Sequence, residues 1–420
     1  MALTAEQSSQ RWAAATAGIR LLAVWGPGLI VMLADTDAGS LITAAQSGAQ
    51  WGYALVVPQL VLIPILYMAQ EMTVRLGVVT QKGHGQLIRE HFGPRWAGLS
   101  ATTLLLSAVG ALLTEFAGIA GVGELFGVSK WITVPVATVF LLGLAFTRSY
   151  RRVERIGIAI GLAEVAFIPA MLLCHPHVHQ VIAGMGSLPL GNSGYVTLLA
   201  ANIGAVIMPW MIFYQQGAVI DKGIKPADLK KERHDTLVGS VVTQVIMITV
   251  VVALAASAYA AHRGMSLQTV GQIAHALSAR LGSGVADVLV GAAILGAALV
   301  AALVVSVAGA WGMAEVLGWK HSLNQGPGRA NAKFYATYGL SHVVGALLVL
   351  TSADLIGLAV DVEVMNALLL PIVLGFLLLL EARALPPEYR MRGAYRVVAT
   401  FACLAVIGFA LFIVPSSLGW

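Results

Sequence analysis

Residues 26–40 read GPGLIVMLADTDAGS and place two carboxylates, Asp35 and Asp37, inside an apolar stretch. The uncharged segments LLAVW and LITAAQSGAQWGYALVVPQLVLIPILYMAQ flank it on its two sides. An aspartate at the centre of a membrane helix costs about 2.5–3.5 kcal/mol on an insertion scale, and intramembrane carboxylates are therefore functional candidates. The stretch predicts a polar site in the middle of a membrane span.

The composition is that of a membrane protein with one integral domain. Of the 420 residues, 58% are hydrophobic and 11% are charged, whereas soluble proteins carry about 25% charged residues. We expect a single transmembrane domain, 21–416, behind a polar segment, 1–20, that lacks the apolar core of a cleavable signal peptide. The two cysteines, Cys174 and Cys403, cannot form a disulfide framework. The net charge of +5 is explained by topology and indicates no nucleic-acid partner.

Apolar segments of sufficient length to span a bilayer recur eleven times. They cover roughly 21–48, 52–74, 98–126, 131–147, 156–174, 195–216, 237–260, 283–315, 335–352, 355–380 and 395–416. With a cytoplasmic N-terminus, 22 of the 25 lysines and arginines fall on the cytoplasmic side, those of the loop 217–236 included, and only Lys130, Arg263 and Arg280 fall outside. This asymmetry obeys the positive-inside rule. It predicts a multi-pass protein of the cell's inner membrane, with segment 1–20 cytoplasmic and the C-terminus external.

Segments one and six each carry helix-breaking residues near their middle. The first has GPG at 26–28 and AGS at 38–40, and the sixth has Gly204 and Pro209. Such residues free backbone polar groups, which a membrane tolerates where they line a polar cavity. A spacing of five segments is expected for two inverted repeats whose interrupted helices form a substrate site at mid-membrane. The alternative is a pair of ordinary kinks.

The residues at these two breaks suggest a cation site. Asp37 and Ser40 share a face if both lie in a helix, whereas Asp35 then points elsewhere. A carboxylate, a hydroxyl and freed carbonyls form an oxygen-rich site for a hard cation. In segment six, the Ala205 carbonyl is a candidate freed group, and Met208 adds a soft sulfur donor that favours transition metals. The plainer interpretation of Met208 is apolar packing.

The same two stretches resemble motifs of the NRAMP family of divalent metal-ion transporters. GPGLIVMLADTDAGS is similar to the family's first-helix motif, GPG…DPGN, with Ser40 in place of the Asn. IGAVIMPW, 203–210, resembles the sixth-helix motif ending in MPH, with Trp210 in place of the His. SYRRVERI at 149–156 and RHDTLVG at 233–239 are also similar to family sequences.

The resemblance implies an all-α, leucine-transporter type of fold with five plus five helices and one more, in which an ion lies between helices 1 and 6. Asp37, the Ala205 carbonyl and Met208 then carry over as metal ligands. Ser40 is shorter than the family's Asn and leaves more room. Glu363 falls where the family often has a glutamine of helix ten near the ion, so it is a further expected ligand. The resemblance implies a transporter and not an enzyme, with no cofactor and no protein partner.

Departures from the family pattern bear on the ion and on proton coupling. Trp210 replaces a histidine of the family's proton route, and span nine lacks the arginine that the family often has there. These features resemble the divergent branch of NRAMP-related magnesium transporters. We expect transport of Mg²⁺ and Mn²⁺, with Fe²⁺ a further candidate, and weak or absent proton coupling. The alternative is an ordinary proton-coupled Mn²⁺/Fe²⁺ symporter.

Further polar residues of the spans are weighed in the same way. The candidates for an ion or proton pathway are Asp35, Trp210 and Glu115. Glu115 aligns approximately with a helix-three acid of the family, and its alternative role is structural pairing. We expect a structural role for Glu164. The histidines of the loop between spans five and six are expected to be exposed and not to form a metal site: His175, His177 and His179.

Two functions from other classes fit less well. In an organic-solute transporter of the same fold, Asp37 would repel a substrate carboxylate. An intramembrane metalloenzyme would need histidine ligands in the spans, and no HExxH motif is present. The expected partners are therefore divalent metal ions and the lipid bilayer.

Overall fold

The computed structural model describes residues 27–145, 150–320 and 328–417, which fold into helices and short helical turns without a strand. Nine helical stretches in these ranges are long and apolar enough to cross a membrane. The first predicted span is divided into two shorter helices, and α7 is also shorter than these nine. The all-α membrane fold is thus confirmed, and the count of eleven spans stays a prediction.

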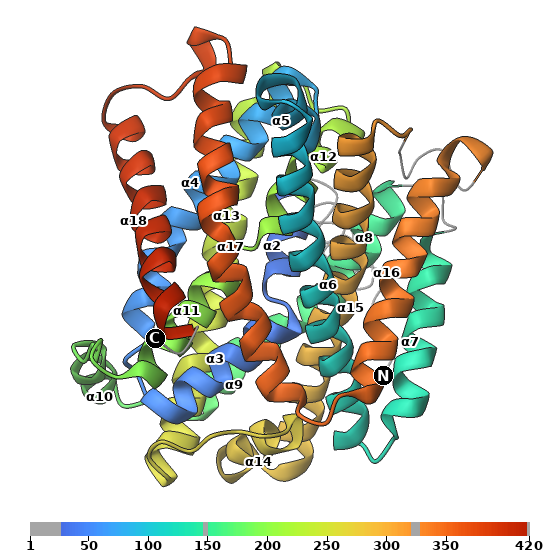
Figure 1. The fold of residues 1–420 in the computed structure, drawn as a ribbon. Coiled ribbons are helices and arrows are strands. Elements are labelled where there is room, and N and C mark those ends of the chain that lie inside the picture. Colours follow the sequence, from blue (N-terminus) through green and yellow to red (C-terminus); the bar gives the residue numbers. More distant parts are fainter. Residues whose placement is uncertain (1–26, 146–149, 321–327, 418–420) are drawn as a thin grey trace, which may run out of the picture.

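The helices stand side by side in a bundle (Figure 1). The long ones are α4 (Val56–Thr80), α6 (Pro94–Leu125), α13 (Leu229–Leu254), α15 (Ser283–Leu317), α16 (Ala332–Thr351), α17 (Leu355–Ala384) and α18 (Gly393–Ser417), and the shorter α7 is Lys130–Ala145. The fifth predicted span is divided into α8 (Tyr150–Gly161), a 3-10 turn (Leu162–Ala166) and α9 (Phe167–Leu173).

Two of the spans are interrupted at the predicted places. The first consists of α2 (Pro27–Asp35) and α3 (Ala38–Trp51), and the sixth of α11 (Ser193–Val206) and α12 (Pro209–Asp221). Proline has no backbone N–H, so Pro209 cannot complete a helical hydrogen bond to the Ala205 carbonyl four residues earlier. Asp37 has extended backbone angles, φ −69° and ψ 177°, and begins α3 as its N-cap.

The two ends of the bundle carry different short helices. One end holds α5 (His84–Phe92), and the other holds α10 (Val178–Met185) and α14 (Val270–Leu281) (Figure 1). Neither α10 nor α14 was predicted from the sequence. Residues 217–221 continue α12 and residues 229–236 begin α13, so the connection between these helices is 222–228.

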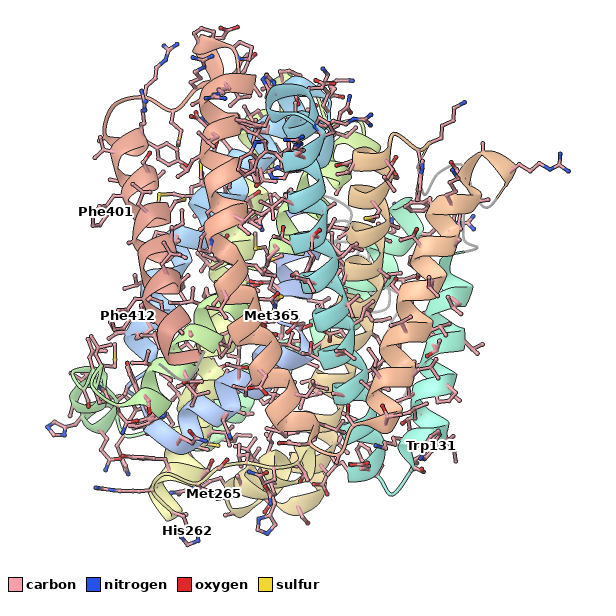
Figure 2. The ribbon with its side chains drawn as sticks, in the orientation of Figure 1. Trp131, His262, Met265, Met365, Phe401 and Phe412 are labelled. Atoms are coloured by element: carbon pink, nitrogen blue, oxygen red, sulfur yellow. The ribbon has the colours of Figure 1, made fainter. Side chains whose placement is uncertain are left out.

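Close packing joins the broken helices to their neighbours. A Cβ atom at Gly204 of α11 would collide with the backbone of α17 at Glu363 and would lie 2.7 Å from the Ala367 nitrogen. Only glycine therefore allows α11 to approach α17 this closely. The outer helices expose apolar side chains on the outside of the bundle, for example Phe401 and Phe412 of α18 and Trp131 of α7 (Figure 2). Such surfaces are expected to face lipid.

Candidate ion-binding site at the two helix breaks

Asp37 lies at the break between α2 and α3, and only one of its two carboxylate oxygens accepts a hydrogen bond from the described residues. Its Oδ1 accepts a hydrogen bond of 2.6 Å from the backbone N–H of Ser40. Its Oδ2 is buried and has no hydrogen-bond partner in the described part of the chain. Asp37 and Ser40 do not lie in one regular helix, which was the condition for their sharing a helical face, because Asp37 is the N-cap residue of α3; the capping bond brings Asp37 to Ser40 instead.

Ser40 connects the two breaks. Its hydroxyl donates a hydrogen bond of 3.0 Å to the Ala205 carbonyl, which Pro209 leaves without a helical donor. Both residues are buried. The sequence-based pairing of segments one and six thus corresponds to a direct contact between their interrupted regions.

Met208 and Trp210 form a pair on the other side of the second break. The indole Nε1–H of Trp210 donates a hydrogen bond of 3.0 Å to the sulfur of Met208, and both side chains are fully buried. The thioether is a weak acceptor, so the indole occupies part of its capacity to bind a metal. The sequence did not predict this bond.

Glu363 reaches the site from α17. Its Oε2 accepts a hydrogen bond of 3.0 Å from the amide of Asn366, whose own oxygen accepts one of 2.8 Å from the Ser107 hydroxyl. Its Oε1 is buried without a hydrogen-bond partner among the described residues. A Cβ atom at Gly39 would collide with this oxygen and approach Thr114 at 3.0 Å. Glu363 therefore faces the start of α3, where Asp37 lies.

The residues that orient Glu363 were not predicted from the sequence. Asn366 follows it by three positions and so shares its face of α17, which was a readable signal in an otherwise apolar segment. Ser107, which holds Asn366, lies on α6, and its contribution depends on how α6 packs against α17. Sequence spacing alone does not give that packing.

Glu115 of α6 is attached to the same break. Its Oε2 accepts a hydrogen bond of 3.2 Å from the Ala38 backbone N–H, and its Oε1 accepts one of 3.2 Å from the Thr114 hydroxyl. Ala38 is the first residue of α3, and a negative charge is favourable at a helix N-terminus. Glu115 thus contacts the backbone next to Asp37 and satisfies one of the unpaired N–H groups of this helix end.

Asp35 and Glu164 complete the set of buried carboxylates. Asp35 makes no hydrogen bond within the described chain, Glu164 lies near the Thr36 side chain, and both carboxylates are at most 1% exposed. Asp35 ends α2, Glu164 lies in the 3-10 turn before α9, and the two interact electrostatically with each other and with Asp37. The described ion pairs involve none of the carboxylates near the breaks. The local charge is therefore negative and needs a proton or a cation to balance it.

The predicted metal site is not a cluster of three or more acidic, histidine or cysteine side chains. The described residues contain no such group arranged to hold a metal. The oxygens that converge here come instead from Asp37, Glu363, Ser40 and the Ala205 carbonyl. His175, His177 and His179 are exposed at the start of α10 and do not belong to this site.

Two interrupted helices that meet at a group of buried oxygens are the arrangement expected of membrane transporters with a substrate site at mid-membrane. A profile of the Nramp family, described as natural resistance-associated macrophage protein-like, matches residues 28–415. The chain belongs to the Nramp family, whose members are metal transporters and not enzymes.

Individual relatives agree with this assignment. A protein of Verminephrobacter eiseniae named divalent metal cation transporter MntH is 24% identical over 417 residues, which cover 95% of this chain and 90% of that protein. A crystal structure of the Eremococcus coleocola manganese transporter has a TM-score of 0.74 at 19% identity, and the match covers 94% of this chain and 87% of that chain. A nucleobase-cation-symport-1 family transporter has a TM-score of 0.58 at 13% identity, with 94% and 93% covered. These two structures support the leucine-transporter type of fold.

Proposed function

We propose that the protein imports Mg²⁺ and Mn²⁺ across the inner membrane by alternating access, with weak or absent coupling to protons. The observation that carries this proposal is the pair of buried carboxylate oxygens, Asp37 Oδ2 and Glu363 Oε1, that have no partner in the described chain. They lie where the Ala205 carbonyl and the Ser40 hydroxyl also meet. A divalent cation would supply the charge that this oxygen-rich group lacks. The name of the MntH relative supports a divalent cargo.

The donor chemistry supports poor discrimination between the two ions. Carboxylate, carbonyl and hydroxyl oxygens suit Mg²⁺ and Mn²⁺ alike, whereas a thioether helps only the softer ion. Met208 is the one soft donor proposed for the site, and its sulfur already accepts the Trp210 N–H. This bond weakens the preference for Mn²⁺ that Met208 would otherwise give.

Weak proton coupling follows from the residue at position 210. An indole does not titrate at physiological pH, and Trp210 donates its only polar hydrogen to Met208. The runner-up is an ordinary proton-coupled symporter of Mn²⁺ or Fe²⁺. It is favoured by Glu115, a carboxylate that contacts the backbone beside Asp37 and could pass on a proton.

Burial and charge distribution support alternating access and the proposed orientation. The proposed ligands Asp37, Ser40, Ala205, Met208 and Glu363 are each at most 1% exposed, so an ion needs a conformational change to reach them. The basic connections of α12–α13 and α17–α18 meet the end of α4, close to α5. We assign this end of the bundle to the cytoplasm by the positive-inside rule.

Uptake into liposomes containing the purified protein tests the function. We expect Mn²⁺ influx that millimolar Mg²⁺ inhibits and that leaves the reading of an internal pH dye unchanged. Asp37→Asn protein in matched liposomes is the control for leakage. Failure of both ions to enter with folded protein would refute the proposal. Influx that resists Mg²⁺ and acidifies the lumen would establish the proton-coupled alternative instead.

A further inference from the structure

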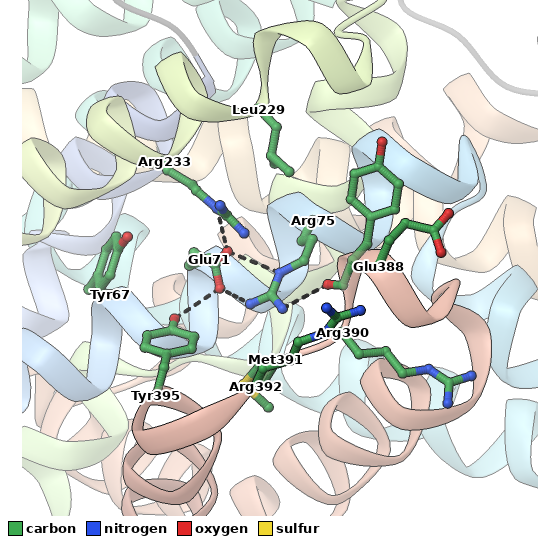
Figure 3. A pocket seen from close by; sticks show the side chains of 11 residues that line it. Tyr67, Glu71, Arg75, Leu229, Arg233, Glu388, Arg390, Met391, Arg392 and Tyr395 are labelled. Atoms are coloured by element: carbon green, nitrogen blue, oxygen red, sulfur yellow. Dashed lines mark hydrogen bonds and ion pairs between the residues drawn. The ribbon is translucent and has the colours of Figure 1, made fainter.

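A second polar region lies away from the helix breaks, in a cavity of about 520 Å³. It is bordered by α4, by the start of α13 and by the connection from α17 to α18 (Figure 3). This is the end of the bundle that we assign to the cytoplasm. None of the proposed metal ligands lines the cavity, so its chemistry is separate from that of metal transport.

The floor of the cavity is a closed network around Glu71. This carboxylate accepts hydrogen bonds from Arg75, from Arg233 Nε at 2.7 Å and from the Tyr395 hydroxyl at 2.9 Å (Figure 3). Arg75 also reaches Glu381 at 3.4 Å. Two arginines thus balance two carboxylates, which gives the cavity a neutral and well-connected floor.

The walls of the cavity hold an excess of unused donors. Arg390 donates its Nε to the Leu385 carbonyl, and Arg392 donates one Nη to the Pro387 carbonyl. The remaining guanidinium N–H groups of both residues, and the Tyr67 hydroxyl, have no hydrogen-bond partner among the described residues. Among the described residues, Glu388 is the only acid that lines the cavity beyond the floor network. The walls are therefore net positive.

More positive charge surrounds the cavity. Lys230 and Lys231 are exposed immediately after Leu229, which lines it, and Arg396 is exposed immediately after Tyr395. Guanidinium groups bind phosphate through paired N–H donors. Basic pockets between transmembrane helices on the cytoplasmic side are suited to anionic lipid headgroups.

The cavity borders an apolar surface that fits the other part of a phospholipid. Tyr395 stands near the start of α18, and the following turns expose Val397, Phe401 and Phe412 at 69%, 73% and 69%. Figure 2 shows Phe401 and Phe412 pointing outward from this helix. A phosphate in the cavity could thus continue into acyl chains along α18, which favours a lipid over a free anion.

We infer that this cavity binds the phosphate headgroup of an anionic phospholipid of the cytoplasmic leaflet. Arg390 and Arg392 contact the phosphate, while the Glu71 network fixes the floor beneath it. The acyl chains lie against the exposed apolar face of α18.

Native mass spectrometry of the full chain, titrated with phosphatidylglycerol or phosphatidylcholine, tests this inference. The variant Arg390→Gln/Arg392→Gln removes two exposed cations, and Lys320→Gln/Arg329→Gln removes two exposed cations elsewhere on the proposed cytoplasmic side. We expect the first variant to bind phosphatidylglycerol roughly 30-fold more weakly than the parent, since each basic residue near a membrane surface contributes about 1 kcal/mol. The second variant should bind like the parent.

A further arm distinguishes the lipid from free phosphate. Millimolar inorganic phosphate should not displace phosphatidylglycerol from the parent protein, and phosphatidylcholine should bind weakly to all three proteins. Equal retention of phosphatidylglycerol by the two double variants would overturn the inference. Displacement by inorganic phosphate at millimolar concentration would also overturn it, in favour of a site for the free anion. Because both variants alter exposed side chains, an unchanged melting temperature provides the check on folding.

Discussion

Carboxylates are buried both at the helix breaks and in the floor of the cavity beside Glu71, but the two regions differ in the hydrogen-bond and ion-pair partners that these carboxylates have. Glu71 and Glu381 are 2% and 4% exposed, and arginine, tyrosine or backbone donors reach both of them. Asp37 and Glu363 are fully buried, and each keeps one oxygen without a partner in the described chain. The carboxylates are therefore buried to a similar extent in the two regions, but only those of the Glu71 network have positively charged partners.

This difference separates a structural role from a functional one. A buried ion pair with complete hydrogen bonding holds elements together, although it adds little net stability over an apolar contact. A buried carboxylate without a partner is costly and is expected to persist where a cation or proton binds. The Glu71 network joins α4, α13, α17 and α18, whereas the charge of the Asp37 region is the one that we propose binds the cargo.

Removal of the Asp37 charge is the strongest way to test this contrast. We expect Asp37→Asn to lower metal affinity at least about 100-fold, because the ion loses its closest fixed charge in a site that excludes water. Folding should be preserved or improved, since a buried unpaired carboxylate has been removed. Isothermal titration with Mn²⁺ and a melting curve measure the two quantities. Asp35→Asn is the matched control and should have a smaller effect, because Asp35 makes none of the contacts of Asp37 with Ser40.

In the Glu71 network, removal of the carboxylate charge is predicted to lower stability and to leave metal affinity unchanged. Glu71→Gln leaves Arg75 and Arg233 without their shared anion, so we expect a loss of about 3–5 kcal/mol of stability. Unfolding in detergent measures this loss, and Mn²⁺ affinity per folded molecule should not change. Glu90→Gln is the control, because its ion pair with Lys82 is 39–42% exposed and such pairs contribute about 0–1 kcal/mol. An equally small effect of Glu71→Gln would contradict the structural role.

Local chemistry made the breaks and most of the site predictable from the sequence. Pro209 frees the Ala205 carbonyl wherever it occurs in a helix, and Asp37 and Ser40 stand at capping distance whatever surrounds them. These facts need no knowledge of packing. They explain why the two interrupted spans and their contact were expected, although the capping role of Asp37 was not.

Contacts between helices were not predictable in the same way. The Met208–Trp210 bond depends on side-chain rotamers, and the Ala38–Glu115 contact depends on how α6 approaches α3. Apolar residues cover α17 on all sides, so its hydrophobic pattern does not indicate that Glu363 faces α3. The short helices α10 and α14 lie outside the apolar segments and gave no span-length signal.

Glu363→Gln removes the second carboxylate charge at the helix breaks and keeps the shape of the side chain, so it tests further how this region differs from the Glu71 network. We expect Mg²⁺ and Mn²⁺ affinities to fall about tenfold, with the larger loss for Mg²⁺, since Mn²⁺ retains help from Met208. Competition between the two ions in the liposome assay measures this difference. Glu381→Gln, a change in the other region, should leave both affinities unaltered. Equal affinities for Glu363→Gln and the parent would place Glu363 outside the ion's coordination.

The smallest expected effect comes from releasing the sulfur of Met208. Trp210→Phe keeps an aromatic side chain at this fully buried position and removes the N–H that now bonds to the thioether. A hydrogen bond of this kind contributes about 1 kcal/mol, which corresponds to roughly fivefold in an equilibrium constant. The free sulfur should therefore favour Mn²⁺ over Mg²⁺ up to fivefold more than in the parent, as measured by the Mg²⁺ concentration that halves Mn²⁺ uptake. Met208→Leu in the same background should abolish the gain, because the change acts through the sulfur. If the gain survives in Trp210→Phe/Met208→Leu, the effect arises from repacking of the break and not from the soft donor.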